Sequence, residues 1–200
     1  MPEEELPLGE IFEQTDLAIL GQVQRMAVEC EDDTEAEPAW NCDVHSPLFS
    51  LAFRRSGRAN CKNITTAKMS AAAKIRVDDR AIEKLVDFGV TLNESIVAEK
   101  DVVDRLRQLR AKTVGINQSI YAPLLYRPLA LSIETKASSS DDDEAHAQLS
   151  VWTASQFKML RRYRWEPTSL KPLPTLPIIS TCKGSFVLHF AIPQENEMVS

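Results

Sequence analysis

The sequence predicts an α/β fold, in which a mixed central β-sheet is flanked by helices and preceded by an acidic helical arm. Helical and strand-like patterns of apolar residues alternate along the 200-residue chain, which favours helices layered on a sheet. Residues 127–134 (RPLALSIE) are almost continuously apolar, as expected for a strand buried on both faces. The charge is also uneven, because residues 1–39 hold twelve acids against Arg25 alone, whereas the rest carries 22 Lys and Arg against 17 acids.

The N-terminal part of the chain is predicted to be helical. Residues 10–28 place apolar side chains at helical spacing, so we expect one amphipathic helix there. The charged stretch 29–38 (ECEDDTEAEP) interrupts this pattern. A second helix is expected from Glu37 to Ala52, with Pro38 in its first turn, where a missing backbone N–H costs little.

Strands and helices alternate in the rest of the chain. We expect an arm over residues 1–36 and a domain over residues 37–200. The later elements, in chain order, are a strand over residues 84–92, a helix over 97–111, a strand over 127–134, a helix over roughly 145–162 and a hairpin over 178–192. Lys183 and Gly184 supply the turn of the hairpin. The acids of residues 138–144 (SSSDDDE) suit the positive N-terminal end of the helix that follows.

Composition excludes several classes of protein. No apolar run approaches the roughly 20 residues that span a bilayer, and the acidic N-terminus lacks the pattern of a secretory signal. The four cysteines show no zinc-type spacing. The six glycines form no phosphate-binding loop, and no G-x-S-x-G elbow is present. We therefore expect an intracellular protein, cytoplasmic or nuclear, that does not associate with membranes, and we leave its oligomeric state open.

Polar side chains in two predicted strands point to a metal site. Glu134 and Lys136 are two residues apart on one strand, so their side chains share a face about 6.6 Å apart. Asp87 stands between apolar neighbours in another strand, and adjacent strands are about 4.8 Å apart. Two carboxylates brought that close repel each other, and a divalent cation relieves the repulsion. An ordinary Glu–Lys pair at a strand end, with Asp87 as a cap, explains the same spacing equally well.

The chemistry of these residue types suits phosphodiester hydrolysis. Mg²⁺ prefers oxygen ligands and keeps waters for a substrate phosphate. Lys136 beside the ion would either orient or deprotonate an attacking water, or stabilise the charge that develops on the scissile phosphate.

A basic stretch near the end of the predicted helix 145–162 is a candidate substrate contact. It contains Lys158, Arg161, Arg162 and Arg164, interleaved with Tyr163 and Trp165. These cations suit a phosphate backbone, with the aromatic rings available for stacking. The same cations also complement the negative C-terminal end of their own helix, and both explanations remain open.

Five segments, in order, resemble the PD-(D/E)XK nuclease superfamily, and in particular the fungal proteins described as PD-(D/E)XK nuclease-like. The resemblance covers about residues 35–192. The matching segments are AWNCDVHSPLFSLAF (39–53), KLVDFGV (84–90), INQSIYAPLLYRPLALSIETK (116–136), AQLSVWTASQFKMLRRY (147–163) and LPTLPIISTCKGSFVLHFA (173–191). The chain departs from the family pattern at Val86, where the name-giving proline would stand. A long insertion between the two acidic strands leaves the substrate class open.

The resemblance implies a restriction-endonuclease-like core and a set of roles. Asp87 and Glu134 would be metal ligands, with the Thr135 carbonyl as a further ligand, and Lys136 would be the catalytic lysine. The remaining roles implied are a further acid at Glu37 and a polar group facing the site at Gln148. Helical spacing from Gln148 adds Trp152 as a wall of the pocket, and Lys158, Arg161 and Arg162 complete the candidate substrate-binding set.

The resulting hypothesis is metal-dependent phosphodiester hydrolysis of nucleic acid with Mg²⁺ or Mn²⁺, with DNA favoured over RNA. The alternative is a protein that keeps this fold without nuclease activity and acts as a binding module or performs other chemistry, since fold does not fix function.

Overall fold

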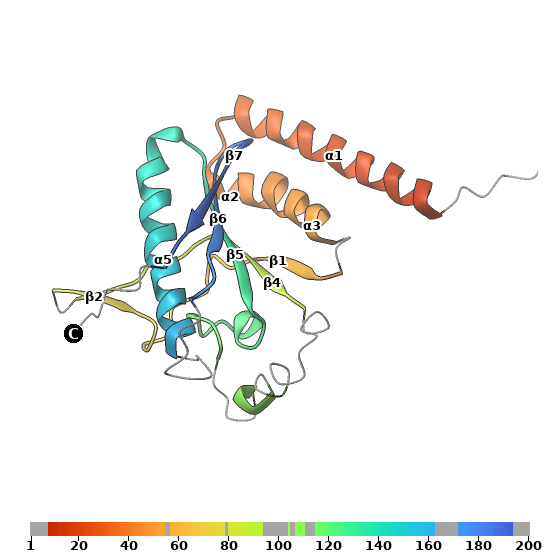
Figure 1. Cartoon of the computed structure of the whole chain (residues 1–200). Helices are drawn as coiled ribbons and strands as arrows, with labels where there is room; N and C mark the ends of the chain where they lie inside the picture. Colours follow the sequence, from red (N-terminus) through yellow and green to blue (C-terminus); the bar gives the residue numbers. More distant parts are fainter. Residues whose placement is uncertain are drawn as a thin grey trace, which may run out of the picture.

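A five-stranded mixed sheet forms the centre of the domain (Figure 1). The computed structural model describes residues 8–54, 57–78, 80–93, 104, 107–110, 115–162 and 172–193. The strand order is β1-β4-β5-β6-β7, and β5–β6 is the parallel pair while the other neighbours are antiparallel. The strands are β1 (Ala59–Asn63), β4 (Phe88–Leu92), β5 (Leu129–Lys136), β6 (Leu176–Cys182) and β7 (Ser185–Ala191).

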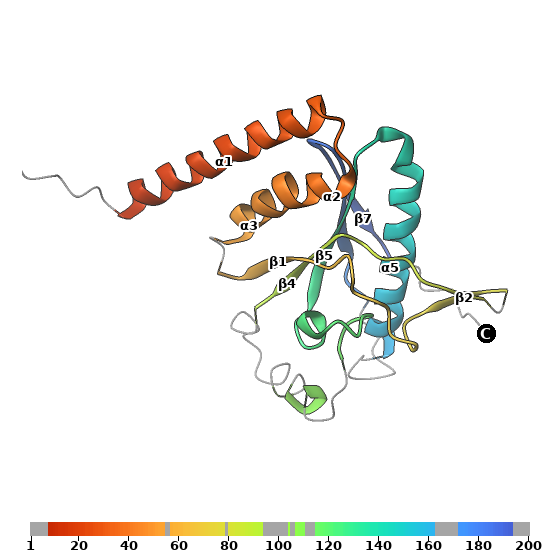
Figure 2. The same ribbon diagram turned by 180° about the vertical axis from the view of Figure 1, so that it is seen from behind.

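Helices cover both faces of this sheet (Figures 1 and 2). One face carries α1 (Leu8–Asp32), α2 (Glu37–Ala39), the π-helix η1 (Trp40–His45) and α3 (Ser46–Arg54). The other face carries α5 (Asp142–Arg162). Two short 3₁₀ turns, η3 (Ala122–Leu124) and η4 (Ser139–Asp141), flank β5 in the chain, and a separate hairpin joins β2 (Ile75–Val77) to β3 (Arg80–Ile82).

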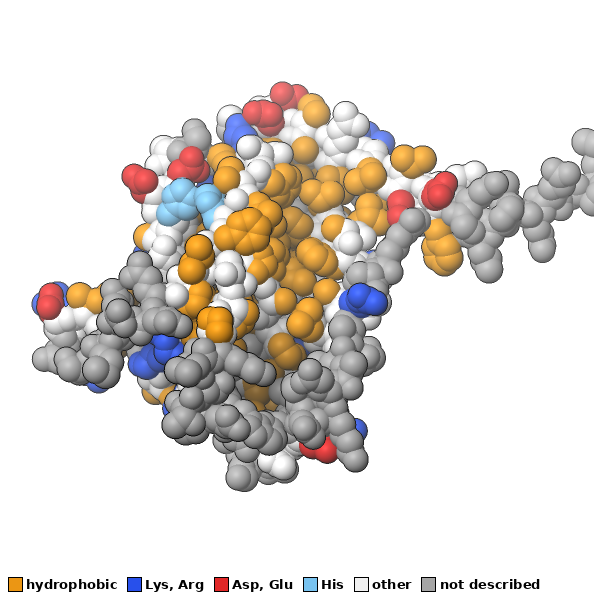
Figure 3. All heavy atoms as spheres, in the orientation of Figure 1, with side chains coloured by type: hydrophobic (Ala, Val, Ile, Leu, Met, Phe, Trp, Pro, Cys, Tyr) orange, Lys and Arg blue, Asp and Glu red, His pale blue; other side chains and the backbone are white. Residues whose placement is uncertain are grey.

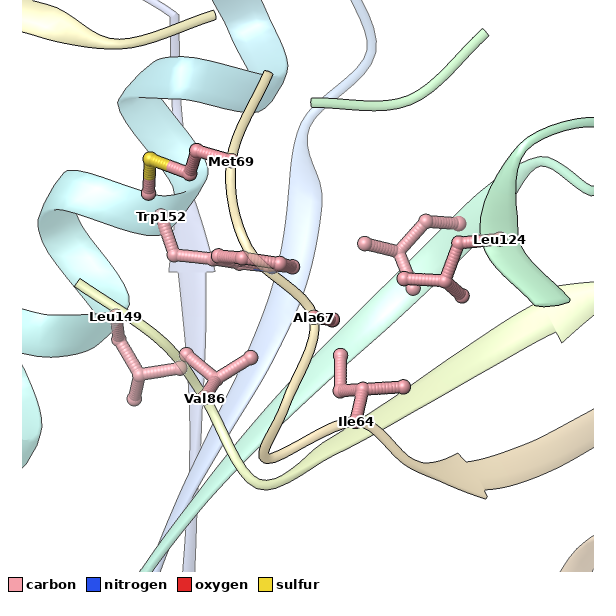
Figure 4. Close-up of a cluster of buried hydrophobic side chains, with 8 residues drawn as sticks. Ile64, Ala67, Met69, Val86, Leu124, Leu149 and Trp152 are labelled. Atoms are coloured by element: carbon pink, nitrogen blue, oxygen red, sulfur yellow. The ribbon is translucent and has the colours of Figure 1, made fainter. Parts of the chain in front are cut away.

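The sheet separates two of the core clusters, and a β-bulge opposite Val90 and Thr91 reverses the alternation of side chains between Leu131 and Leu129 of β5. Phe88 and Ile133 pack with Phe49 of α3 on one face. On the other face Leu129 packs with Trp152 of α5 in a larger cluster, part of which Figure 4 shows. Because β5 has buried residues on both faces, its nearly continuous apolar sequence is explained, and the expected strand is confirmed.

Within the described residues of the acidic arm, one long helix packs on the rest of the structure. The expected helix over 10–28 extends to Leu8–Asp32, and its buried residues Val23 and Cys30 contact Trp40 and Val44. An ion pair of 2.9 Å joins Glu31 of this helix to Lys183 in the β6–β7 turn. Within the described part of the chain, no helix is long and apolar enough to cross a membrane.

Several expected elements have different limits. The expected helix from Glu37 to Ala52 is divided by the π-helix into three consecutive helical pieces. The strand expected over 84–92 begins only at Phe88. The helix expected over 97–111 lies mostly outside the described residues, although Asp104 and residues 107–110 are helical.

The C-terminal hairpin agrees with the expectation, since β6 and β7 pair across Lys183 and Gly184. Strand β7 forms one edge of the sheet. Its side chains Phe186, Leu188 and Phe190 are partly exposed, and apolar atoms gather on the face of the molecule shown in Figure 3.

Candidate active site

Asp87 and Glu134 meet at the point where β4 and β5 separate. The β4–β5 pairing starts at Phe88 and Ile133, so extending this register by one residue sets Asp87 opposite Glu134. The backbone N–H of Thr135 donates to Asp87 Oδ2 over 2.9 Å, and the Thr135 hydroxyl lies 2.7 Å from the same oxygen. These contacts hold the carboxylate across the gap between the strands, in place of a backbone ladder bond.

Lys136 connects Glu134 on β5 to Glu37, an acid on α2. Its Nζ atom donates to Glu134 Oε1 over 2.6 Å and to Glu37 Oε2 over 3.3 Å. Glu134 and Lys136 are buried, whereas Glu37, at the first position of α2, keeps about a third of its side chain exposed. Glu37 therefore forms the solvent-facing edge of the cluster. The ordinary Glu–Lys pair considered from sequence is present, but it is buried and shared with a second acid.

The cluster holds three carboxylates against one ammonium, and the pKa values reflect this imbalance. Burial, together with the charges of Asp87 and Glu37, raises the pKa of Glu134 to about 8 against the opposing effect of Lys136. Burial and the charge of Asp87 also raise the pKa of Glu37. Burial alone would lower the pKa of Lys136, but its hydrogen bond to Glu134 and the charges of both glutamates outweigh burial and raise it. Lys136 is therefore a cation at neutral pH.

A buried network of polar side chains from the π-helix η1 contacts Thr135. The Asn41 amide lies 2.7 Å from Thr135 Oγ1 and 3.1 Å from His45 Nδ1. His45 Nε2 lies 2.8 Å from the Lys183 carbonyl, which can only accept, so this nitrogen carries the proton. Burial lowers the pKa of His45, and the neutral ring leaves Nδ1 as an acceptor. The Asn41 atom that faces both groups is Oδ1; exchanging the two ends of this amide would let its nitrogen donate to His45 Nδ1 and Thr135 Oγ1, and the Thr135 hydroxyl would then donate to Asp87.

Sequence reasoning did not find Asn41 and His45. Both lie on the π-helix, and both are buried although they are polar. The available signal was a polar pair four residues apart that accompanies Trp40 and Val44 on the buried side of the predicted helix. The histidine alone carried no such signal, because its second partner, the Lys183 carbonyl, is distant in sequence.

Gln148 and Trp152 lie on α5, beside the strands that carry the acids. Gln148 Nε2 donates to the Leu85 carbonyl over 3.4 Å, two residues before Asp87, and its Oε1 is buried without a hydrogen-bond partner. Trp152 has no exposed surface, and its indole N–H donates to Ser132 on β5. Trp152 thus packs in the core beneath the site, and contact with a substrate would need surface that this side chain lacks.

The basic candidates lie at the opposite end of α5. Lys158 is exposed ten residues after Gln148, which is about 15 Å along a helix. Its Nζ atom donates to the Lys74 carbonyl over 2.8 Å. Arg161 and Arg162 are exposed in the last turn, and residues 163–165 of the basic stretch lie outside the described residues. The structure therefore separates these cations from the acidic cluster.

The residues of the cluster fit a divalent ion. Glu134 Oε2 is buried and has no hydrogen-bond partner, and a bound cation would satisfy it. With all three carboxylates ionised, the formal charge around Lys136 is −2, which one divalent ion balances. No three His, Cys, Asp or Glu side chains form a ready-made metal-binding group in the described ranges. An ion held by Asp87, Glu134 and the Thr135 carbonyl would complete its shell with water or substrate oxygens.

Comparison with known proteins identifies the family. A family model described as the PD-(D/E)XK nuclease superfamily matches residues 12–200, which includes most of the arm helix as well as the sheet. Searches of curated proteins and of solved structures found no match. The mixed five-stranded sheet with helices on both faces is the restriction-endonuclease-like architecture that the sequence resemblance implied. The chain belongs to the PD-(D/E)XK nuclease superfamily.

Proposed function

We propose that this protein is a metal-dependent nuclease that hydrolyses phosphodiester bonds, with Mg²⁺ or Mn²⁺ as the ion and DNA as the favoured substrate. The observation that carries the proposal is the buried Lys136, which lies within hydrogen-bond distance of Glu134 and Glu37 where Asp87 enters the sheet. Burying Asp87 and Glu134 beside the partly exposed Glu37 is costly for stability alone, because the carboxylates repel one another. Family membership makes a nuclease-like function the expected purpose of this arrangement.

Each residue has a proposed role in the reaction. Asp87, Glu134 and the Thr135 carbonyl hold the ion, which supplies Lewis acidity toward the phosphate and a bound water of lowered pKa. Lys136 remains charged because its pKa is raised, so it stabilises negative charge on the phosphate rather than acting as a base. Glu37 positions Lys136 from the solvent side. Gln148 supplies a neutral amide at the edge of the site.

The alternative is a diverged member of the superfamily that binds a ligand without cleaving nucleic acid. The observation that favours it is the high pKa of Glu134, about 8, which leaves this group largely protonated at neutral pH when no cation is bound. A protonated Glu134 would donate a hydrogen bond instead of holding a metal. The two functions therefore differ in whether a divalent ion replaces that proton.

A cleavage assay on the full chain tests the proposal. Supercoiled plasmid, a single-stranded oligonucleotide and a matching RNA would be incubated with the protein in Mg²⁺, Mn²⁺ or EDTA. We expect metal-dependent cleavage that Asp87→Asn abolishes and that Lys136→Ala lowers by roughly 10²-fold or more, the usual effect of losing one charge-stabilising group. Circular dichroism of both variants controls for folding. Wild-type protein that cleaves none of these substrates with either ion would favour the alternative.

A further inference from the structure

A hollow of about 630 Å³ lies outside the acidic cluster, between the segment from Lys68 to Lys74, the β2–β3 hairpin and the C-terminal half of α5. Four cations line it, namely Lys68, Lys74, Arg76 and Lys158, against one acid, Glu83. The formal charge of the lining is thus +3, in a chain whose total is −6. Such a local reversal of sign marks a place where an anion is favoured.

Glu83, the single acid that lines this basic hollow, is already bonded to other groups of the protein. Lys74 Nζ pairs with Glu83 Oε2 over 2.5 Å, and the Met69 backbone N–H donates to Glu83 Oε1 over 2.8 Å. These two bonds connect both ends of the lining segment, residues 68–74, to Glu83, the residue that follows β3. Glu83 therefore acts as a structural brace between the two sides of the basic hollow, and its charge is balanced by Lys74.

Lys158, Lys68 and Arg76 contribute the remaining positive charge. Lys158 Nζ is fixed over the basic hollow by its bond to the Lys74 carbonyl, and an ammonium group has two further donors for a ligand. Among the described residues, no carboxylate forms an ion pair with Lys158 or Lys68. The lining segment is in turn held on α5, because the Ser155 hydroxyl donates to Met69 Sδ. The cations are thus carried by an anchored segment and a long helix.

Part of the lining of the basic hollow is apolar. Ala71, Ala72 and Ala81 line it together with Met69 and the exposed Ile120. Alanine side chains leave room for a ligand, and a lining that combines cations with apolar side chains suits a molecule with both a charged and an apolar part. A nucleotide has this composition, because its phosphate is anionic while its sugar and base offer apolar faces.

The position of the basic hollow links it to the acidic cluster. Glu83 and Asp87 are four positions apart in the chain, so their Cα atoms are at most about 14 Å apart. Figure 2 shows this connection as the chain that leaves the β2–β3 hairpin and runs past α5 to β4. One strand of DNA rises about 3.4 Å per nucleotide, so this distance corresponds to at most about four nucleotides.

We propose that the basic hollow binds the phosphodiester backbone of the substrate strand, within about four nucleotides of the bond that is cleaved. The inference rests on the proposed nuclease function and deepens it, because it names where the strand is held. The hollow is a binding site separate from the acidic cluster, and its cations contact phosphate groups that do not react.

Binding of labelled DNA to the full chain tests this inference. Fluorescence anisotropy would be measured in EDTA, which prevents metal-dependent cleavage, with a single-stranded oligonucleotide and with its duplex. The test variant is Lys68→Gln/Lys158→Gln, and the matched control is Arg25→Gln/Arg107→Gln, which removes two exposed cations elsewhere. At about 50 mM salt we expect the test variant to bind roughly tenfold more weakly than the control.

The dependence on salt gives a second readout. Loss of two phosphate contacts should reduce the slope of log K against log salt by about 1.8 on duplex and about 1.4 on a single strand. In the cleavage assay the test variant should raise KM and leave kcat nearly unchanged, because it lacks a contact far from the reacting phosphate.

The outcomes separate this inference from the proposed function. If wild type cleaves DNA and the test variant binds and cleaves like the control, the basic hollow is not a binding site while the nuclease function stands. If the test variant loses binding but wild type cleaves nothing with either ion, the hollow is a nucleic-acid site in a protein that is not a nuclease. Wild-type protein that binds neither DNA overturns both.

Discussion

Thr135 makes two contacts with one oxygen of Asp87, through its backbone N–H at 2.9 Å and its hydroxyl at 2.7 Å. The backbone bond is independent of the side chain at position 135, whereas the hydroxyl bond also connects Asp87 to Asn41. The Asp87 carboxylate is thus oriented by Thr135, the residue that lies between Glu134 and Lys136 in the sequence.

Thr135→Val should weaken metal binding. Valine keeps the shape of threonine and the backbone bond but removes the hydroxyl, so Asp87 loses one of the two bonds that orient it. Partners that orient a metal ligand are typically worth about 10-fold to 100-fold in affinity, and we expect a loss near the lower value. Titration calorimetry with Mn²⁺ measures it, with Thr135→Ser as the control that restores a hydroxyl. Equal affinity in the Val and Ser variants would show that the hydroxyl does not position Asp87.

Glu134→Gln should change how stability depends on pH. The folded-state pKa of Glu134, about 8, lies above its ordinary value of 4.5, so the folded protein binds this proton more tightly than the unfolded chain. The associated stability is present below pH 4.5 and is lost as the pH rises through 8. Glutamine is neutral at every pH, so in EDTA the variant should exceed wild type at pH 8 by roughly 4 kcal/mol and match it near pH 4.

Urea unfolding at several pH values checks this prediction. Adding Mg²⁺ should stabilise wild type most above pH 8, where little proton must be displaced, and should stabilise Glu134→Gln much less. Parallel pH profiles of the two proteins in EDTA would mean that Glu134 is ionised without a metal.

Gln148→Ala should lower cleavage without lowering the melting temperature. The amide makes one long hydrogen bond of 3.4 Å to the Leu85 carbonyl, and its Oε1 has no partner, so little stability is lost with it. Activity and thermal unfolding are measured on the same preparation, with Ser150→Ala on the exposed side of α5 as control. A variant with full activity would remove Gln148 from the site.

Neutralising the acidic arm should strengthen DNA binding at low salt. Because α1 packs through Val23 and Cys30, deleting the arm would uncover Trp40, and charge removal is the cleaner change. Glu13→Gln/Asp32→Asn/Asp33→Asn removes three exposed acids, and Gln14→Ala/Gln22→Ala/Gln24→Ala is the matched control on the same helix. Anisotropy should show tighter binding that fades with added salt, since screening removes repulsion between the arm and phosphates. Unchanged binding at low salt would end the idea that the arm shields the domain.

Local patterns predicted the elements that local chemistry determines. The apolar run of β5 and the Lys183–Gly184 turn indicated their structures directly, because burial and turn geometry depend on neighbouring residues. Strand β1 was missed, since its sequence ANCKN is short and only the small residues Ala59 and Cys61 alternate with polar ones, and it forms the other edge of the sheet, paired only with β4. Its strand conformation follows from that pairing and not from its own composition.

The candidate site likewise divides into residues that the sequence pattern indicated and residues that only the tertiary structure brings together. The sequence singled out Asp87, Glu134 and Lys136, and the structure brings these side chains together, while their roles stay a prediction. The Asn41–His45 network and the basic hollow could not be predicted, because their members come from segments far apart in the chain. Lys68 and Lys158 are ninety residues apart and become neighbours only when the lining segment lies on α5.

The π-helix η1, between α2 and α3, sets the angle around the helix axis at which Glu37 of α2 projects relative to the side chains of α3. A π turn accommodates one more residue than an α turn, and each residue of an α-helix advances the side chain by about 100° around the axis. Deleting one residue from this turn would rotate Glu37 by that angle relative to Phe49, which is locked in the core. The chain could then bury Phe49 or direct Glu37 toward Lys136, but not both. The surplus residue is therefore what allows one continuous helical segment to serve the core and the charged cluster together.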